Sequence, residues 1–426
     1  MRPTVYPVGI MTTISLSKDM QSAATRAVFS ALEAKGGKGC VRFVGGCVRN
    51  LLMGKPVSDL DLSTQLTPDE TEAALEAAGI RSVPTGKAFG TITAVIDGKT
   101  FSGSTSSLLE TYEITSLRED VETDGRRAVV KYTTDWSKDA LRRDFYLNAL
   151  YADIEGTVYD PTGEGIADAN AGRVRFIGEA EQRIREDYLR ILRFFRFTAG
   201  YAVAIDAGSL AACVALKEGI DGLSGERIQQ EILKTLSLTE PLAAFTTMQV
   251  HGLMPHVVPG WQAIGEALPE LAAVIALTED PEIRLIALID SGVGLSAAAL
   301  HSCQTRLKWS QRIYNRLREA GRALDGLAEN APFSRLMYLH GRQATEDAVF
   351  LAAAHQNKEA SAVAYVLHML EGLEIPVFPV KGADLIARGI PAGPEVGNAL
   401  KQIETEWLNH DFSQSVIETA LDAVAK

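Results

Sequence analysis

Residues 41–64 read VRFVGGCVRNLLMGKPVSDLDLST, and this stretch decides how the chain begins to fold. Residues 40–44 predict a short strand, Gly45-Gly46 a tight turn, and residues 47–53 a helix that ends at a glycine. Further on, polar and apolar residues alternate. This period of two places Asp59 and Asp61 on one face of a predicted strand at residues 58–63.

Asp59 and Asp61 form the first candidate site. Two carboxylates two residues apart on a strand point at one place, where they can hold one or two divalent ions for phosphoryl or nucleotidyl transfer. Hard oxygen ligands favour Mg²⁺ over zinc. A D-x-D pair alone is more typical of a solvated strand edge. The functional interpretation therefore depends on its context, because Gly45 and Gly46 make a turn that a triphosphate can approach and Arg49 follows within one helical turn.

The remaining pattern predicts an α+β fold. Helix is expected at residues 21–35, and residues 89–96 alternate before an Asp97-Gly98 turn, which is typical of a hairpin. After a solvated loop at 102–107, two more strands at residues 113–117 and 129–132 should complete a small sheet. Beyond about residue 165 the chain is predicted to be helical. We expect a small mixed-sheet head, a helical neck, and a helical body and tail (residues 21–165, 166–260 and 261–426).

Two charged segments carry further candidate residues. In Arg142-Arg143-Asp144, with Asn148 four residues on, Arg143 suits phosphate oxygens and Asp144 a ribose hydroxyl, although the start of a helix with surface arginines is an equally good interpretation. Residues 176–197 predict a buried helix with a polar stripe of Asp187, Arg190 and Arg193 at three-residue spacing. Arg196 lies about half a turn away from Asp187 and need not share its partner. An ion-pair network would be the default explanation of so many charges.

Composition excludes several classes of protein. The chain has 426 residues, 46% apolar and 23% charged, as in ordinary globular proteins. It contains no apolar run long enough for a membrane span, so no membrane partner is expected. Four cysteines without a C-x-x-C pair, and an N-terminus without a signal-peptide pattern, predict reduced thiols in a cytoplasmic protein. All seven histidines lie at or after His251, so a site in the first half cannot use a histidine base.

Four ordered motifs resemble those of the class II tRNA nucleotidyltransferase and bacterial poly(A) polymerase family. They are Gly45-Gly46-Cys47-Val48-Arg49, Asp59-Leu60-Asp61, Arg142-Arg143-Asp144 and the EDYLRILR of residues 186–193. The resemblance covers residues 40–235 and includes the SGERI of residues 224–228. It implies a polymerase-β-like head in which the aspartates hold the catalytic metal ions and the glycine turn contacts the triphosphate of CTP or ATP.

The same resemblance implies that the Glu-Asp-x-x-Arg helix selects the base in place of a template. Asp187 can accept from the exocyclic amine of cytosine or adenine while Arg190 donates to the adjacent ring acceptor, and guanine and uracil present the reverse order. Arg193 and Arg196 are further nucleotide-binding candidates on this helix. Glu113 is a candidate third carboxylate on a neighbouring strand. Residues 117–130 match the loop that, in the family, helps to switch from C to A addition.

Two departures from the family pattern stand out. Asn50 replaces the usual aspartate, so a helix-stabilising ion pair is expected to be missing. Tyr188 replaces the proline of many bacterial members, and tyrosine also occurs in CCA-adding enzymes. The leading interpretation is a CCA-adding enzyme that acts on tRNA with CTP and ATP. Poly(A) polymerase, CC-only addition and a catalytically silent RNA-binding protein are the alternatives.

A basic segment in the second half is a candidate RNA-binding surface. Lys308, Arg312 and Arg316 follow one another at four-residue spacing, which places them on one helix face. A protein of net charge −12 must concentrate positive charge somewhere to hold tRNA. The alternative is a solvated basic face on a packed helix. The sequence gives no sign of an obligate protein partner.

Overall fold

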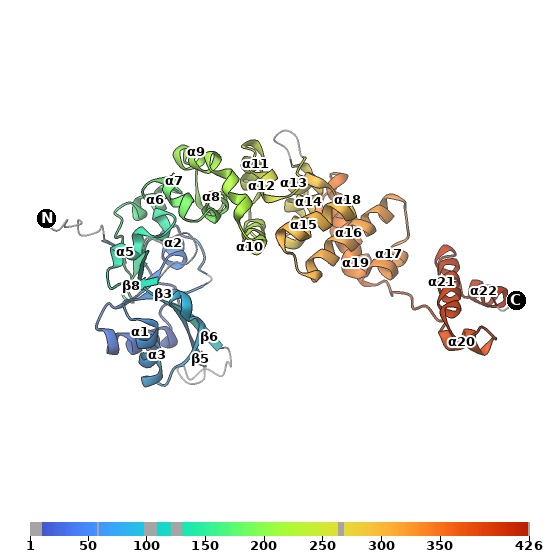
Figure 1. Ribbon diagram of the computed structural model, residues 1–426, viewed down its shortest axis with the longest axis horizontal. Coiled ribbons are helices and arrows are strands. Elements are labelled where there is room, and N and C mark those ends of the chain that lie inside the picture. Colours follow the sequence, from blue (N-terminus) through green and yellow to red (C-terminus); the bar gives the residue numbers. More distant parts are fainter. Residues whose placement is uncertain (1–10, 58, 98–108, 121–129, 263–267, 425–426) are drawn as a thin grey trace. The chain divides into compact units, whose positions relative to one another are not determined.

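The computed structural model describes residues 11–57, 59–97, 109–120, 130–262 and 268–424. The chain divides into two compact units, Met1–Gly222 and Leu223–Lys426, and Figure 1 labels most of their helices. The predicted three-part division with boundaries near residues 165 and 260 stays a prediction.

The first unit contains a mixed sheet of eight strands in the order β1-β10-β9-β2-β3-β6-β5-β4. Of these pairs, β3 with β6 is parallel and the others are antiparallel. The strands are β1 Met11–Thr13, β2 Val41–Val44, β3 Asp61–Thr64, β4 Arg81–Gly86, β5 Thr91–Asp97, β6 Leu109–Ser116, β9 Tyr151–Ala152 and β10 Thr157–Tyr159. A separate ribbon pairs β7 Arg118–Asp120 with β8 Val130–Tyr132.

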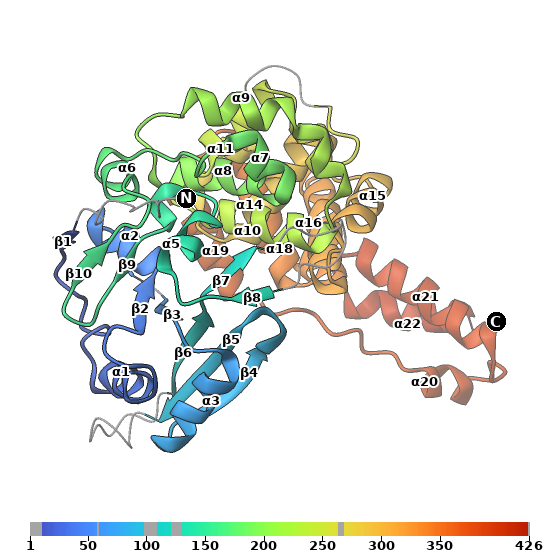
Figure 2. The ribbon, with the colours of Figure 1, turned by 60° about the vertical axis from the view of Figure 1, so that its left-hand side comes forward.

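Alternation along the central strands gives the sheet one apolar and one polar face. Phe43 pairs with Leu62, and Leu62 pairs with Ile114, so these buried side chains form a continuous apolar row. Helices α1 (Ala23–Gly36) and α3 (Pro68–Ala77) cover that face (Figure 2). A shift of β3 by one residue would expose Leu62 at a cost of about 2 kcal/mol, so burial fixes the register that turns Asp61 to the opposite face.

The other helices of the first unit follow the predicted helical pattern. Helix α8 buries six apolar side chains, which explains why a segment so rich in arginine still packs as a core helix. These helices are α2 Gly46–Leu52, α5 Trp136–Leu141, α6 Gly165–Ala171, α7 Ala180–Glu186, α8 Leu189–Tyr201 and α9 Ala207–Ala215, with 3₁₀ turns η1 Lys87–Phe89, η2 Tyr146–Asn148 and η3 Lys217–Gly222.

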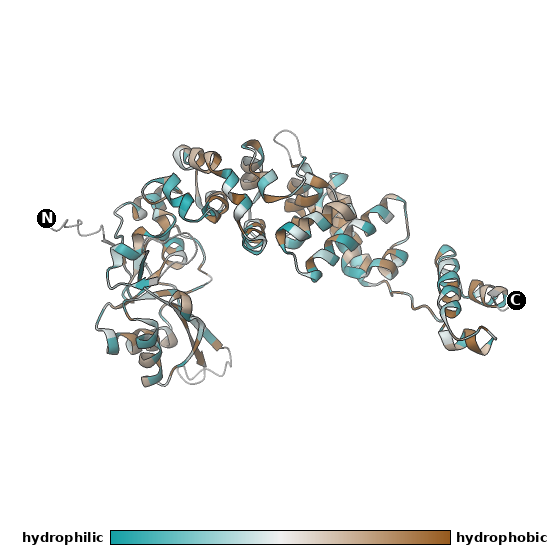
Figure 3. Ribbon diagram, in the orientation of Figure 1, coloured by the Kyte–Doolittle hydropathy of each residue, from teal (hydrophilic) through white to brown (hydrophobic). Residues whose placement is uncertain are grey.

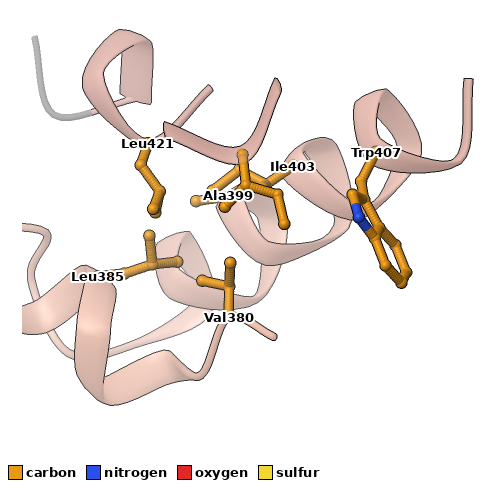
Figure 4. Packing of buried hydrophobic residues seen from close by; sticks show 7 residues of the cluster. Val380, Leu385, Ala399, Ile403, Trp407 and Leu421 are labelled. Carbon is orange, nitrogen blue, oxygen red and sulfur yellow. The ribbon is translucent and has the colours of Figure 1, made fainter. Parts of the chain in front are cut away.

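The described part of the second unit is helical, with apolar and polar residues interleaved along its helices (Figure 3). The helices are α10 Gly225–Leu236, α11 Leu242–Val250, α12 Met254–Val257, α13 Pro269–Leu277, α14 Pro281–Val293, α15 Ala297–Leu307, α16 Gln311–Ala328, α17 Phe333–His340, α18 Arg342–His355, α19 Ala360–Glu371, α20 Gly382–Ala387, α21 Pro394–Asn409 and α22 Gln414–Val424. The last three share a small core (Figure 4), in which Leu385, Ile403 and Trp407 are buried.

The fold class is confirmed, but several elements differ from the prediction. Asp59 precedes β3 and does not belong to it, so the two aspartates do not alternate within one strand. Strand β4 was not predicted, because RSVPTG is polar and contains a proline. The predicted strand at residues 129–132 pairs with β7 and does not join the main sheet. The predicted loop at 102–107, and residues 121–129 of the loop at 117–130, lie outside the described residues.

A further difference concerns the segment at residues 176–197, which was predicted as one helix. The segment is split into α7 and α8, and Asp187 lies in the break with an extended backbone (φ −157°, ψ 104°). Asp187 is therefore not part of a continuous helical stripe. Among the described residues, no single helix is long and apolar enough to cross a membrane, whereas α14 and α15 together satisfy length and composition but meet at a bend of 115°.

Candidate functional site

Three carboxylates lie near one another at the polar face of the sheet. Asp61 and Glu113 are directly paired in the parallel ladder of β3 and β6, and Asp59 lies two residues before Asp61. Partial burial and the charges of Glu113 and Asp59 raise the pKa of Asp61, and Arg143 opposes this shift. The structure therefore brings the predicted catalytic residues together as mutually repelling anions, although by ladder pairing and not by alternation along one strand.

The chemistry of these donors fits a divalent cation. All three are hard oxygen ligands, and a cation between them would relieve the repulsion that raises the pKa of Asp61. Among the described residues, no three His, Cys, Asp or Glu side chains already lie close enough to enclose an ion. Asp59, Asp61 and Glu113 are each exposed, so ligand positions must also come from water or from a substrate's phosphate oxygens.

The glycine turn lies beside this cluster. Gly45 has φ 68° and ψ −116°, a conformation that other residues rarely adopt, and it starts α2 directly after β2. A Cβ atom at Gly45 would lie 3.8 Å from Nη1 of Arg143. The turn and the Arg143 guanidinium therefore border the same space next to Asp61, as expected for groups that contact a triphosphate.

Arg143 is held by a residue that the sequence analysis missed. Asp139, which is 1% exposed, accepts hydrogen bonds from Nη2 of Arg143 (2.8 Å) and from the Tyr151 hydroxyl (2.7 Å), and it also pairs with Arg142. Burial alone would raise the pKa of Asp139, but the two arginines outweigh burial and hold it well below its usual range. Nη2 of Arg143 also reaches Oγ of Ser63 at 3.4 Å.

The spacing of Asp139 to Arg142 and Arg143, three and four residues, was the available signal. Helix α5 ends at Leu141, and Arg142 is its C-cap, so the alternative interpretation of this segment as a helix start is wrong. Arg143 therefore projects from the end of a helix whose own carboxylate fixes its direction.

Asp144 and Asn148 form hydrogen bonds to arginines of two helices, α8 and α2. The buried Asp144 carboxylate accepts from Nε of Arg193 (2.7 Å), from Asn148 (3.1 Å) and from its neighbouring backbone. Asn148 in turn accepts from Arg49 at 2.6 Å. Burial would raise the pKa of Asp144, but Arg193 and these hydrogen bonds lower it. These contacts engage both oxygens of Asp144, and its expected contact with a ribose stays a prediction.

Arg49 lies deeper than its predicted role suggested. Its side chain is 5% exposed, stacks on Tyr201 and donates to the Tyr201 hydroxyl (2.7 Å) as well as to Asn50. The Asn50 amide donates to the carbonyl of Pro56 at 2.6 Å. Within the described residues Arg49 forms no ion pair with a carboxylate, and neutral acceptors bind its guanidinium. The ion pair expected to be missing because of Asn50 stays a prediction.

The base-selecting candidates lie at the start of α8. Oδ1 of Asp187 accepts from the backbone N–H of Leu189 at 3.1 Å. Arg190 donates to Glu186 (2.7 Å) and to the carbonyl of Arg142 (3.0 Å), so its guanidinium lies against the segment that carries Arg143. The structure places both candidates next to the head of the same compact unit. Arg196 stacks over Phe197 at 4.4 Å, one residue along α8.

The three basic residues proposed to bind RNA do not share a helix face. Lys308 is the C-cap of α15, whereas Arg312 and Arg316 belong to α16, which begins after the N-cap Ser310. Arg316 is enclosed by carboxylates, with contacts of 2.7–2.8 Å to Glu282 and Asp280 and a bond to the buried Asp347. Arg312 is 67% exposed and pairs with Glu282. The prediction that these three residues lie on one helix face was wrong, while their RNA-binding role stays a prediction.

Comparison with known proteins adds independent findings. Residues 41–175 match the Poly A polymerase head domain family, and residues 202–264 match the family described as a probable RNA and SrmB-binding site of polymerase A. The chain is 32% identical over 397 residues to the mitochondrial CCA tRNA nucleotidyltransferase 1 of Danio rerio, covering 88% of this chain and 85% of the relative. It is 28% identical over 371 residues to the CCA-adding enzyme of Levilactobacillus brevis, covering 85% and 88%.

A solved structure shows the same fold. The CCA-adding enzyme of Bacillus stearothermophilus, in complex with CTP, aligns over 96% of this chain and 98% of its own, with a TM-score of 0.73 and 24% identity. The resemblance read from the motifs is thus confirmed over most of the length. The protein belongs to the family of CCA tRNA nucleotidyltransferases and poly(A) polymerases that shares this head domain, and it is a nucleotidyltransferase whose reaction implies a divalent metal ion.

Proposed function

We propose that this nucleotidyltransferase adds C, C and A in turn to the 3′ end of tRNA from CTP and ATP, with Mg²⁺ as its metal. The observation that carries the proposal is the pairing of Asp61 with Glu113, beside Asp59 and within reach of Arg143. A module that only binds RNA has no need of three repelling carboxylates on one exposed sheet face, since their repulsion costs stability.

Asp59, Asp61 and Glu113 would hold the Mg²⁺ ions. When bound, such ions neutralise charge on the transferring phosphate and lower the pKa of the attacking hydroxyl. The chain's own groups bind and orient the nucleotide. Arg143, fixed by Asp139, offers its planar fork to phosphate oxygens, and the backbone of the Gly45-Gly46 turn lets the triphosphate approach without a side chain in the way.

Base choice is assigned to Asp187 and Arg190, because one accepts and the other donates. Arg190 is anchored by Glu186 and by the Arg142 carbonyl, which limits the positions that its remaining donors can take. A base is selected well only by groups that cannot move to suit the wrong one, so this anchoring supports the proposed role. Arg193 and Arg196 lie further along α8, and Arg193 is tied to Asp144.

The RNA is expected to reach the second unit, because the RNA-binding family match at residues 202–264 extends into it. Of the basic residues proposed there, Arg312 has an exposed guanidinium that can exchange its pairing with Glu282 for a phosphate. Arg316 would leave the buried Asp347 without its cation if it did so, and its role is therefore assigned to stability. A cytoplasmic location is also proposed, supported by four free and buried cysteines.

A nucleotide-addition assay tests the function. Purified protein with Mg²⁺ is given tRNA that lacks its CCA end, together with single or paired labelled nucleotides, and products are separated at single-nucleotide resolution. The expected result is two additions from CTP alone, one further addition once ATP is present, and then a halt. A long A tail would identify a poly(A) polymerase, a halt after two C residues a CC-adding enzyme, and no addition at all would refute the proposal.

A further inference from the structure

A cavity of about 780 Å³ opens on the second unit, and residues of that unit alone line it. The first turn of α10 and one side of α15 line it, together with Pro259. Apolar atoms of Leu223 and Ala298 form part of its wall. The polar residues of the lining are Ser224, Glu226, His301, Ser302, Thr305, Arg306 and Lys308. It is large enough for a nucleotide-sized group, and its cations outnumber its carboxylate.

Close packing of two helices shapes this cavity. A Cβ atom at Gly225 would lie 2.1 Å from the carbonyl oxygen of Arg306, so only glycine lets α10 begin this close to the end of α15. Arg306 also donates to the carbonyl of Leu223 at 2.9 Å, which ties the two sides together. The Ser224 side chain makes no capping hydrogen bond to α10 in the described structure, although serine there normally does. Its hydroxyl is exposed at the cavity.

Lys308 adopts a backbone conformation that does not suit lysine. It is the C-cap of α15 with φ 56° and ψ 38°, the left-handed region that glycine occupies without penalty and that costs lysine free energy. Backbone outliers of this kind cluster at functional sites, where the side chain serves a purpose that outweighs the strain. The Lys308 side chain is exposed and lines the cavity.

Lys308 also differs from its neighbours in charge pairing. Arg312 and Arg316 are both paired with Glu282, whereas Lys308 forms no ion pair with any carboxylate in the part of the chain that the structure describes. Glu226 faces the same cavity and opposes an anion, but Arg306 adds to the positive side. An unpaired ammonium at a strained position beside hydroxyl groups has the chemistry that suits a phosphate oxygen.

We propose that this cavity binds one phosphodiester of the tRNA backbone, with Lys308 as its main phosphate ligand, Ser224 as a hydrogen-bond donor, and Leu223 and Pro259 against the ribose. The proposal rests on the function proposed above, because it takes tRNA as the ligand. It names the subsite within the second unit that carries salt-dependent affinity, and it favours Lys308 over Arg316 among the predicted basic residues.

Lys308→Gly tests the proposal, since glycine removes the charge and also relieves the backbone strain. The probe is tRNA lacking its CCA end, and its dissociation constant is measured across a series of salt concentrations. We expect affinity to fall about fivefold and the slope of log K against log salt to fall by about one unit, as for one lost phosphate contact. The midpoint of urea unfolding should stay the same or rise, so that weaker binding cannot be a folding defect.

Two further variants make the result specific. Lys308→Arg keeps the charge and should retain the salt slope, whereas Lys358→Ala removes another exposed lysine of the same unit that does not line the cavity and should leave the slope unchanged. An unchanged slope in Lys308→Gly, or an equal fall in Lys358→Ala, would overturn the proposal. Failure of the wild-type protein to extend tRNA would instead refute the proposed function, so the two failures are distinguishable.

Discussion

Replacing Asp61 by asparagine should abolish activity and at the same time stabilise the metal-free protein. The substitution keeps the shape of the side chain but removes one of three repelling charges. In metal-free buffer the expected gain in the free energy of unfolding is about 1 kcal/mol at pH 7. Turnover should fall by roughly 10³-fold or more, because a metal ligand is lost.

The magnitude follows from the ladder. Paired residues on adjacent strands lie about 4.8 Å apart, and two unit charges at that distance repel by roughly 0.9 kcal/mol in water and 3.5 kcal/mol at an effective dielectric constant of 20. Asp61 and Glu113 are exposed, so solvent screening places the value towards the lower end. Because the pKa of Asp61 is raised in the folded state, the wild type suffers this penalty at neutral pH and loses it as pH falls through that raised pKa. The advantage of Asp61→Asn should therefore shrink as pH falls through that raised pKa.

The assay is urea unfolding of both proteins, first with EDTA and then with Mg²⁺. The ion should stabilise the wild type by about 1.4 kcal/mol at ten times its dissociation constant, whereas Asp61→Asn should respond much less. Glu76→Gln, which changes the same charge at an exposed position on α3, serves as the matched control and should show neither effect. Equal stability of Asp61→Asn and wild type in EDTA, together with equal stabilisation by Mg²⁺, would refute the assignment of this cluster as the metal site.

Three other outcomes can be measured independently. Asp187→Ala should weaken discrimination against UTP and GTP by about 1–3 kcal/mol, read as the ratio of kcat/KM values for the four nucleotides, and loss of all addition without misincorporation would contradict the base-selecting role. Arg316→Met should lower the free energy of unfolding by about 3–5 kcal/mol, because Asp347 is 0% exposed and loses its cation. Arg312→Gln, at an exposed ion pair, should lower it by less than about 1 kcal/mol. Similar losses in both variants would show that Arg316 does not neutralise a buried carboxylate. The folded-state pKa values of Asp139 and Asp144 are depressed, so these carboxylates stabilise the fold above about pH 4 and stop doing so as pH falls towards those lower values. Urea unfolding from pH 7 to pH 3 should show this loss of stability. Asp144→Asn should lose less stability over that range than the wild type.

The sheet could be predicted where burial enforces alternation. Leu62 lies between Phe43 of β2 and Ile114 of β6, and its burial determines which residues of β3 face outward. That is why Asp61 was placed correctly while Asp59, which precedes the strand, was not. Strand β4 was missed because its polar residues and its proline give no alternating signal. Its pairing with β5 determines its conformation, and the residues of β4 alone do not reveal that a partner strand is present.

The candidate site was found through charge and spacing, but the residues that hold its arginines in position were not. Asp139 lies in the same motif as Arg143, yet a lone aspartate before two arginines looks like an ordinary surface charge. Only the fold shows that it is 1% exposed and bonded to Tyr151. The break at Asp187 was missed for a similar reason, since residues 180–199 all suit a helix and no glycine or proline marks an interruption.

The basic segment of the second unit shows why counting charges locates an RNA surface poorly. One error was avoidable, because Ser310 is a typical N-cap and indicates that α16 starts after Lys308. The other was not, because the partners of Arg316 lie 31–36 residues away and only folding brings them together. An arginine surrounded by three carboxylates adds almost nothing to the field that RNA experiences, whereas a lysine without a carboxylate partner adds a full charge. The cations that matter for binding are therefore those left over after internal pairing, and in this segment that criterion selects Lys308 first and the exposed Arg312 second.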